Sequence, residues 1–469
     1  MSDLRVADPA PPITRAVWAA ASVMALGGFL GNMDGSIVAI GLDTMRVSLH
    51  AGLEEIQWVA TAYLLGLSAA LPLTPWLVRA VGAGRLWLYV LGAFILTSVL
   101  CALAPTAVLL ILVRAVQGMT AGVLVAAGQT VIGHAVGPAR LGRVMATLGL
   151  VVGLAPIAGP SVGGFLLASS SWPALFWVNV PVGVLALLLG LRFVPRGAPE
   201  PRPPMDWFGL GLVSAGMPVV VYALTSLGGS GHRAVLPYVA LAGAGFASLA
   251  VFVWWSLRGA HPVLRLRLVA DPVMAAGLLS VLLSGASMLG AALLLPLWFQ
   301  LRLGMGSVST GLLLVPLGLG TTAVMPAAGR LTDRYGGGTV ATAGSLVVLV
   351  TTAPFPWLGP HPSMPFVQVL LSVRGAGLGL AMMPAMTAAY ASVRAADLGD
   401  ATALANIAMR VGGALGGALS VLVLSRGLAT GGPSLGFTWA FAALGVICLL
   451  AAAASGWLRH AELHHRKES

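Results

Sequence analysis

Two residues in this chain have the types needed to carry a charge through a hydrophobic environment. Asp34 stands inside a long apolar segment, whereas the other acidic residues fall in tails, in loops or at segment ends. Arg114 stands inside a second apolar segment and is followed by Gln117 and Gly118. A membrane helix retains a charge only where it faces a partner or a water-filled cavity. The two residues therefore predict an intramembrane ion pair whose carboxylate binds and releases a proton.

Two plainer interpretations of these residues stay open. Asp34 could be a structural counter-ion that never titrates, and Arg114 could tie helices together through backbone carbonyls.

Membrane helices must position this pair, because the composition excludes an ordinary soluble domain. Of 469 residues, 58% are hydrophobic and only 8% are charged, against about a quarter charged in soluble domains. A helix needs about 20 apolar residues to cross a bilayer. We expect an all-α integral membrane protein with fourteen transmembrane helices near 16–42, 55–78, 85–104, 107–133, 142–168, 174–193, 207–227, 235–257, 272–299, 307–328, 338–359, 365–390, 401–425 and 436–458.

The arginines predict the orientation of these helices. An even number of spans puts both termini on one side, and most basic residues fall in the loops of that same side. Loops rich in Lys and Arg stay in the cytoplasm. Four arginines are expected on the opposite, extracellular side of the membrane: Arg46, Arg233, Arg302 and Arg426. We therefore expect a multi-pass protein of the cell membrane with cytoplasmic termini, and the net charge of +11 needs no nucleic acid to explain it.

An internal repeat organises the spans into two halves. Val113-Arg114-Ala115 reappears 260 residues later as Val373-Arg374-Gly375. Six helices with loops take roughly 190 to 200 residues, so two extra helices separate the copies. The predicted organisation is a tail (1–15), a six-helix bundle (16–193), a linker (194–206), an inserted pair (207–258), a second six-helix bundle (272–458) and a tail (459–469).

Several chemistries are disfavoured by the residues that the chain lacks. Its one lysine, Lys467, precedes Glu468, so no Walker-type phosphate loop and no intramembrane retinal Schiff base can form. Cys101 and Cys448 are too few for a metal or iron–sulfur set. We expect no cofactor and no metal. A membrane enzyme is disfavoured because no cluster of His, Asp or Glu lies near one interface, and a channel because no ring of carboxylates is evident.

A glycine- and proline-rich motif gives the strongest family resemblance. It runs from Gly149 to Gly164 and resembles the antiporter signature of the major facilitator superfamily, in its fourteen-helix drug:proton antiporter branch. The residues that match are Gly149, Gly153, Pro156, Gly159, Pro160, Gly163 and Gly164. Glycines let helices approach closely, and the two prolines create a bend at which a gate could hinge. Ordinary glycine-mediated packing is the alternative.

Further segments are similar to the same family. Asn32 to Val38 resembles its first helix, Arg114 to Gly118 its fourth, and Asn406 with Arg410 its thirteenth. The family's Gly-x-Leu-x-Asp-Arg-x-Gly loop is well matched in the second half only, by Gly329, Asp333, Arg334 and Gly336. In the first half Arg79 replaces the aspartate, so we expect an altered latch there. The resemblance implies that these residues, with Arg374 and Arg410, act in gating.

The resemblance implies a proton-coupled exporter of amphipathic drugs or antibiotics that works by alternating access, most simply as a monomer in the lipid bilayer. Asp34 and Arg114 would couple export to protons. Candidate substrate contacts are Asn32, Gln117, Gln129, Trp298, Gln300, Met382, Met383 and Asn406, each of which could instead be plain core. Three intramembrane arginines against one acid make a neutral or anionic cargo as plausible as a cation. An exporter of one endogenous lipid or metabolite is the alternative within transport.

Overall fold

The computed structural model of the chain describes residues 14–136, 141–197, 199, 205–229, 235–259, 261–359 and 361–468, and its secondary structure is helical. The elements in chain order are α1 (Arg15–Ser48), α2 (Leu53–Ala70), η1 (Leu71–Leu73), α3 (Thr74–Val81), α4 (Ala83–Ala102), α5 (Ala107–Val136), α6 (Leu141–Ser169), α7 (Ala174–Trp177), α8 (Asn179–Phe193), α9 (Trp207–Gly229), α10 (Val235–Arg258), η3 (Leu266–Ala270), α11 (Pro272–Leu297), η4 (Trp298–Arg302), α12 (Ser307–Tyr335), α13 (Gly337–Thr352), η5 (Phe355–Trp357), α14 (Met364–Ala391), η6 (Ala395–Asp397) and α15 (Leu398–Glu468).

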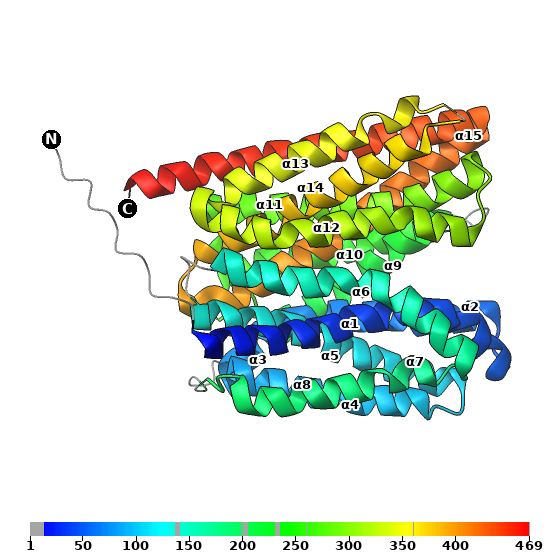
Figure 1. Cartoon of the computed structure of the whole chain (residues 1–469). Helices are drawn as coiled ribbons and strands as arrows, with labels where there is room; N and C mark the ends of the chain where they lie inside the picture. Colours follow the sequence, from blue (N-terminus) through cyan, green and yellow to red (C-terminus); the bar gives the residue numbers. More distant parts are fainter. Residues whose placement is uncertain are drawn as a thin grey trace.

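The helices form two bundles that lie side by side, α1–α8 and α11–α15 (Figure 1). We call the end of the molecule at which α1 begins and α15 finishes the terminal end, and the opposite end the distal end. Within the described residues, twelve helical segments are long and apolar enough to cross a membrane. Their apolar composition explains why they are helices, because a helix satisfies all its backbone polar groups internally in lipid.

The boundaries of the helices follow local chemistry. Asp271 caps α11, accepting a hydrogen bond from the Met274 backbone N–H at 2.8 Å, and Pro272 occupies the first turn. Gly82 ends α3 and Gly336 ends α12, with φ angles of 91° and 88°. Other residues rarely adopt this conformation. The last glycine of the repeated loop thus makes the same turn in both halves.

Helix α15 covers two of the expected spans, 401–425 and 436–458, and is interrupted between them. Gly431 and Gly432 depart from helical geometry, with Gly432 at φ 72°, and Pro433 follows directly. The chain reverses direction at this point, so that the last helical stretch returns to the terminal end (Figure 1).

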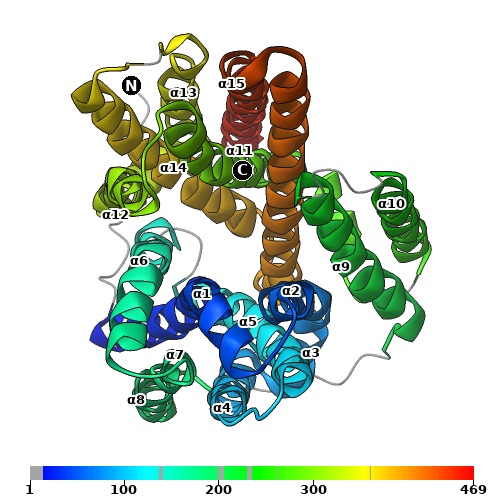
Figure 2. The same ribbon diagram turned by 90° about the vertical axis from the view of Figure 1, so that its right-hand side faces the viewer.

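Helix α9 packs against α2 and α15 at the side of the two bundles, and α10 packs on the outer side of α9 (Figure 2). The Ser248 hydroxyl on α10 donates to the Leu212 carbonyl on α9 at 2.9 Å. Tyr222 on α9 stacks on Trp58 of α2, with ring centroids 5.4 Å apart. This pair therefore covers one side of the boundary between the bundles.

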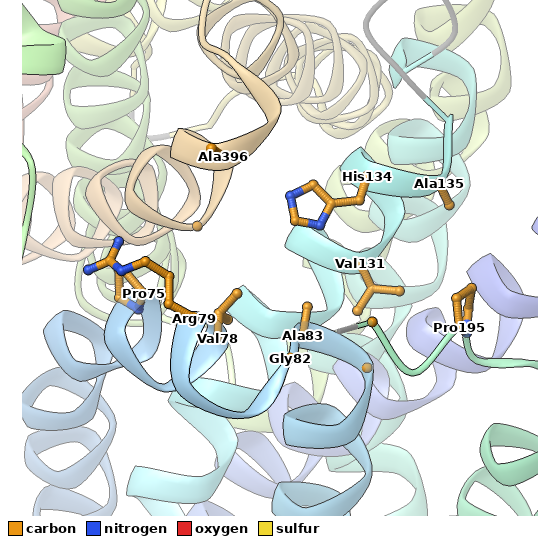
Figure 3. Close-up of a pocket in the computed structure, with 13 residues that line it drawn as sticks. Pro75, Val78, Arg79, Gly82, Ala83, Val131, His134, Ala135, Pro195 and Ala396 are labelled. Atoms are coloured by element: carbon orange, nitrogen blue, oxygen red, sulfur yellow. The ribbon is translucent and has the colours of Figure 1, made fainter. Parts of the chain in front are cut away.

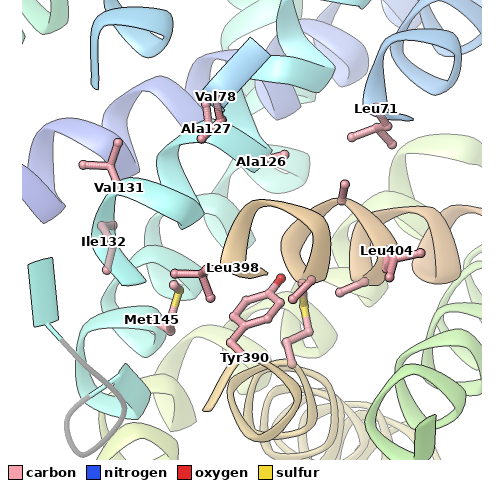
Figure 4. Close-up of a cluster of buried hydrophobic side chains, with 14 of the residues drawn as sticks. Leu71, Val78, Ala126, Ala127, Val131, Ile132, Met145, Tyr390, Leu398 and Leu404 are labelled. Carbon is pink, nitrogen blue, oxygen red and sulfur yellow. The ribbon is translucent and has the colours of Figure 1, made fainter. Parts of the chain in front are cut away.

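A hydrophobic core joins the two bundles near the terminal end. Val131 and Met145 of the first bundle belong to the same buried cluster as Tyr390, Leu398 and Leu404 of the second (Figure 4). The bundles are therefore held together by buried apolar surface at this end.

Candidate functional site

The structure brings Asp34 and Arg114 into direct contact. The Arg114 guanidinium on α5 donates from Nη1 to Oδ2 of Asp34 on α1, and both side chains are shielded from solvent. Arg114 also donates from Nε to the Val59 carbonyl of α2 at 3.2 Å. The fixed cation thus compensates the only carboxylate that the sequence places within a span.

Two amides complete the surroundings of the carboxylate. Asn179, at the start of α8, donates to Asp34 Oδ1 at 2.7 Å, and Gln117 reaches the same oxygen at 3.4 Å. Gln117 also accepts from Arg114 Nη1 at 2.7 Å and donates to the Ser98 hydroxyl at 2.8 Å. Sequence reasoning assigned Gln117 to the substrate and gave Asn179 no role. An isolated amide within an apolar span was the signal that could have identified Asn179.

Tyr63 of α2 contacts both Arg114 and the backbone of α1. Its ring lies 4.2 Å from the Arg114 guanidinium carbon, and its hydroxyl donates to the Gly31 carbonyl of α1. A cation over an aromatic face gains electrostatic stabilisation. Tyr63 therefore packs on the cation of the Asp34–Arg114 pair and links α2 to α1.

The repeated arginine of the second half has a different environment. Arg374 on α14 donates to the Thr352 hydroxyl and to the carbonyl and hydroxyl of Ser287, at 3.2 and 3.1 Å for Ser287. These hydrogen-bond partners are neutral groups. The two halves therefore share a buried arginine, and the ion pair with a carboxylate belongs to the first half.

Polar contacts between the bundles gather at the terminal end. Arg79 of α3 donates to Asp400 of α15 at 2.7 Å, and these side chains are 10% and 0% exposed. The Thr130 and Thr402 hydroxyls lie 3.0 Å apart, and Asn406 donates to Gln129 at 2.7 Å. We call the Arg79–Asp400, Thr130–Thr402 and Gln129–Asn406 pairs the closed-end contacts.

Sequence reasoning placed Asp397 and Asp400 in a loop, but the structure buries both. Asp397 pairs with Arg265 and Arg394, and Asp400 also accepts from the Arg265 backbone N–H at 3.1 Å. Arg394 is three residues from Asp397, but sequence pattern could not reveal the contacts with Arg265, which lies 132 residues from Asp397 and 135 from Asp400.

The well-matched second copy of the loop also contacts the first bundle. Asp333 of α12 lies beside the start of α6, and its carboxylate is 3.5 Å from Arg143 Nε. Gly329 packs on the α6 backbone at Gly142 and Arg143. Arg334 is exposed and its guanidinium lies 5.2 Å from the centre of the Tyr335 ring.

A pocket of about 330 Å³ opens at the terminal end next to Arg79 (Figure 3). It lies between α3, α4 and α5 of the first bundle and residues Ala396 and Gly399 of the second. His134 on α5 borders it and contacts the Ala395 carbonyl at 2.8 Å. The pocket thus crosses the boundary between the bundles at the end where they touch.

The glycine-rich motif of α6 packs against two different partners. A side chain at Gly159 or Gly163 would collide with Ser36 or Ile37 of α1, whereas one at Gly149 would meet Met325 and Met383 of the second bundle. Gly164 has no neighbour within 4 Å that a side chain would meet. The surroundings of Gly153, Pro156 and Pro160 lie outside what the structure describes, and so does any bend there.

The predicted substrate contacts do not form one cluster. Gln129 and Asn406 join the bundles, and Tyr390 donates to the same Gln129 oxygen at 3.3 Å. Asn32 donates to the Gly28 carbonyl of its own helix at 2.8 Å. Met382 and Met383 are partly buried against the core, Gln300 is exposed, and Trp298 is fully buried next to Phe355 and Phe441.

Twelve candidate spans within the described part of the chain, arranged in two packed helical bundles around a buried ion pair, define a multi-pass membrane protein. The sequence profile of the Major Facilitator Superfamily matches residues 24–417, and the chain belongs to this family. It is therefore a transporter and not an enzyme.

Known proteins resemble the chain over most of its length. A multidrug resistance protein B homolog of Mycobacterium tuberculosis is 30% identical over 410 residues, covering 86% of this chain and 76% of the relative. The lincomycin resistance protein LmrB of Listeria monocytogenes is 29% identical over 402 residues, covering 86% and 85%. The proton:xylose symporter XylE shares the fold, with a TM-score of 0.65, 13% identity and coverage of 94% and 95%.

Proposed function

We propose that the chain is a proton-coupled antiporter that exports amphipathic drugs or antibiotics by alternating access. The observation that carries the proposal is the buried contact between Asp34 and Arg114, because a carboxylate held by one fixed cation inside a span can exchange a proton. The names of the multidrug and lincomycin resistance relatives support a drug as cargo.

In the proposed cycle, a proton entering from outside neutralises Asp34. The neutral acid binds Arg114 and Asn179 less tightly, and the network that joins α1, α5 and α8 loosens. One charge that crosses the membrane gains about 2.3 kcal/mol per 100 mV, to which the pH gradient adds. One proton per cycle is therefore enough for modest accumulation, and no cofactor is required.

We further propose fourteen membrane crossings, with the inserted pair formed by α9 and α10. Two features support two crossings beyond the twelve candidate spans. Helix α6 is 29 residues long and is not among the twelve. Helix α15 is counted as one candidate span, but its break at Gly431 and Gly432 divides it into two. The domain boundaries stay as the sequence predicts them.

The distribution of arginines supports cytoplasmic termini in the cell membrane, which would place the terminal end inside the cell. In that orientation the closed-end contacts lie on the cytoplasmic side, so the proposed state is closed to the cytoplasm. The proposed partners are protons, a small amphipathic substrate and the bilayer, without nucleic acid, for a monomer.

The test is lincomycin flux into proteoliposomes under an imposed pH gradient, comparing the native chain with Asp34→Asn and Arg114→Ala. We expect the Asp34→Asn protein to exchange lincomycin down its gradient and to lose uphill transport. Asp43→Asn is the matched control, because Asp43 lies on the same helix with its side chain 80% exposed. Uphill transport by Asp34→Asn at the native rate would refute proton coupling through this residue.

Screening the same proteoliposomes against a panel of unrelated amphipathic compounds separates a drug exporter from an exporter of one endogenous lipid or metabolite. A drug exporter accumulates several members of the panel. A dedicated exporter accumulates none.

A further inference from the structure

Arg410 is an intramembrane arginine for which the structure records no hydrogen bond or ion pair among the described residues. It lies on α15, within a candidate span, and part of its surface is accessible. By contrast, Arg114 pairs with the Asp34 carboxylate, and Arg374 donates hydrogen bonds to two hydroxyls and one backbone carbonyl. A guanidinium in a membrane is costly unless it faces a partner or water. Among the described residues no polar group fills this role for Arg410, and its accessible surface can receive a partner from outside the polypeptide.

The position of Arg410 on α15 shows which way it faces. Thr402, Asn406 and Arg410 are spaced four residues apart, so they share one face of the helix. Thr402 and Asn406 contact α5 of the first bundle and are buried. Arg410 is one turn farther from the terminal end, and its side chain is partly accessible. Among the described residues, the hydrogen bonds that join α5 to α15 end at Asn406, and Arg410 occupies the next turn of α15.

Arg410 also lies near Tyr63 of the first bundle, and the Tyr63 ring lies 4.2 Å from the Arg114 guanidinium carbon. The buried carboxylates near the bundle boundary are already paired, Asp34 with Arg114 and Asp400 with Arg79. The electrostatic potential near Arg410 therefore favours an anion.

We propose that Arg410 binds the acidic group of the transported molecule, which makes the cargo class an amphipathic anion such as an aromatic carboxylate or sulfonate. This inference rests on the proposed export function, since it names the substrate of the same interface. A guanidinium binds a carboxylate or sulfonate through two parallel N–H donors, and the surrounding apolar surface accepts the rest of the molecule.

The test is equilibrium binding of two labelled probes to the purified protein, naphthalene-2-sulfonate and the matched cation 2-naphthyltrimethylammonium. We expect the native chain to bind the sulfonate at least tenfold more tightly than the cation. Arg410→Gln should weaken sulfonate binding about ten- to hundredfold, because a hydrogen-bonded charge is lost. Arg426→Gln is the matched control, since it removes the same charge from an exposed position of the same helix.

Arg410→Lys keeps the charge and tests the role of Arg410 if the glutamine variant does not fold. It should retain sulfonate binding within about tenfold of native, because a point charge replaces the bidentate group. Equal binding of both probes by the native chain, or native sulfonate affinity in folded Arg410→Gln, would overturn the proposal. Binding needs no gradient, so a chain that prefers the sulfonate but does not accumulate it uphill under an imposed pH gradient would contradict proton coupling alone.

Discussion

Removing the Arg79–Asp400 ion pair should open the terminal end. The pair joins α3 to α15, and its side chains are 10% and 0% exposed. In Arg79→Gln, the fully buried Asp400 keeps the Arg265 backbone N–H at 3.1 Å as its remaining direct donor. When the bundles separate at this end, water reaches the carboxylate. The substitution therefore penalises the closed state far more than the open one.

The size of the shift follows from the burial of the pair. Removing one partner of a buried ion pair costs about 3–5 kcal/mol. Glutamine can still donate one hydrogen bond, so we take about 2–3 kcal/mol for the penalty on the closed state. At about 1.4 kcal/mol per factor of ten, the open fraction should rise roughly 30- to 150-fold.

Thr402→Cys provides the assay. Thr402 is fully buried against Thr130 in the closed end, so a cysteine there should react with a maleimide only when this end opens. The native Cys101 and Cys448 are buried, and the chain without the added cysteine reports their background labelling. Labelling of purified protein, with and without Arg79→Gln, then measures the change in the open fraction.

Two further proteins make the test specific to the pair. The double variant Arg79→Gln/Asp400→Asn has two facing amides and no charge at this position. Its cysteine at position 402 should therefore react more slowly than the summed effects of the two single substitutions predict. Arg46→Gln is the control, because Arg46 and Asp43 form an exposed pair with side chains 38% and 80% accessible, and such pairs contribute little. The reasoning is refuted if the effects of Arg79→Gln and Asp400→Asn on the labelling rate add up in the double variant. It is also refuted if Arg79→Gln labels at the native rate.

Three other predictions concern packing and the second arginine. Gly159→Ala should lower both the melting temperature and export because its Cβ would collide with the Ser36 hydroxyl of α1, whereas the Cβ of Gly164→Ala has no neighbour within 4 Å and should change neither; equal losses would contradict this. Trp298→Leu should cost about 2–4 kcal/mol of stability in thermal unfolding and leave cargo preference unchanged; an altered cargo preference at native stability would make it a pocket residue. Arg374→Gln should lower stability without changing the proton-to-cargo ratio in flux assays, since its recorded partners are neutral, and a changed ratio would contradict this role.

The contact between Asp34 and Arg114 could be predicted from the sequence. One acid and a few arginines within apolar spans must find partners, because hydrocarbon supplies none. This constraint pointed to Asp34 and Arg114, which do meet. It could not identify Asn179, because an amide carries no charge that demands compensation, and its contact with Asp34 depends on how α8 packs on α1.

The sequence by itself determined that the chain is a helical membrane protein, because its apolar segments leave too few charged residues for a water-facing surface. Only the tertiary structure decided how the two bundles meet. Arg79 and Asp400 are 321 residues apart, and Gln129 and Asn406 are 277 apart. Helical periodicity relates residues three or four positions apart and carries no information over such separations. The structure alone therefore showed which polar groups join the bundles at the terminal end, and that Arg410 lies one turn beyond Asn406 on α15.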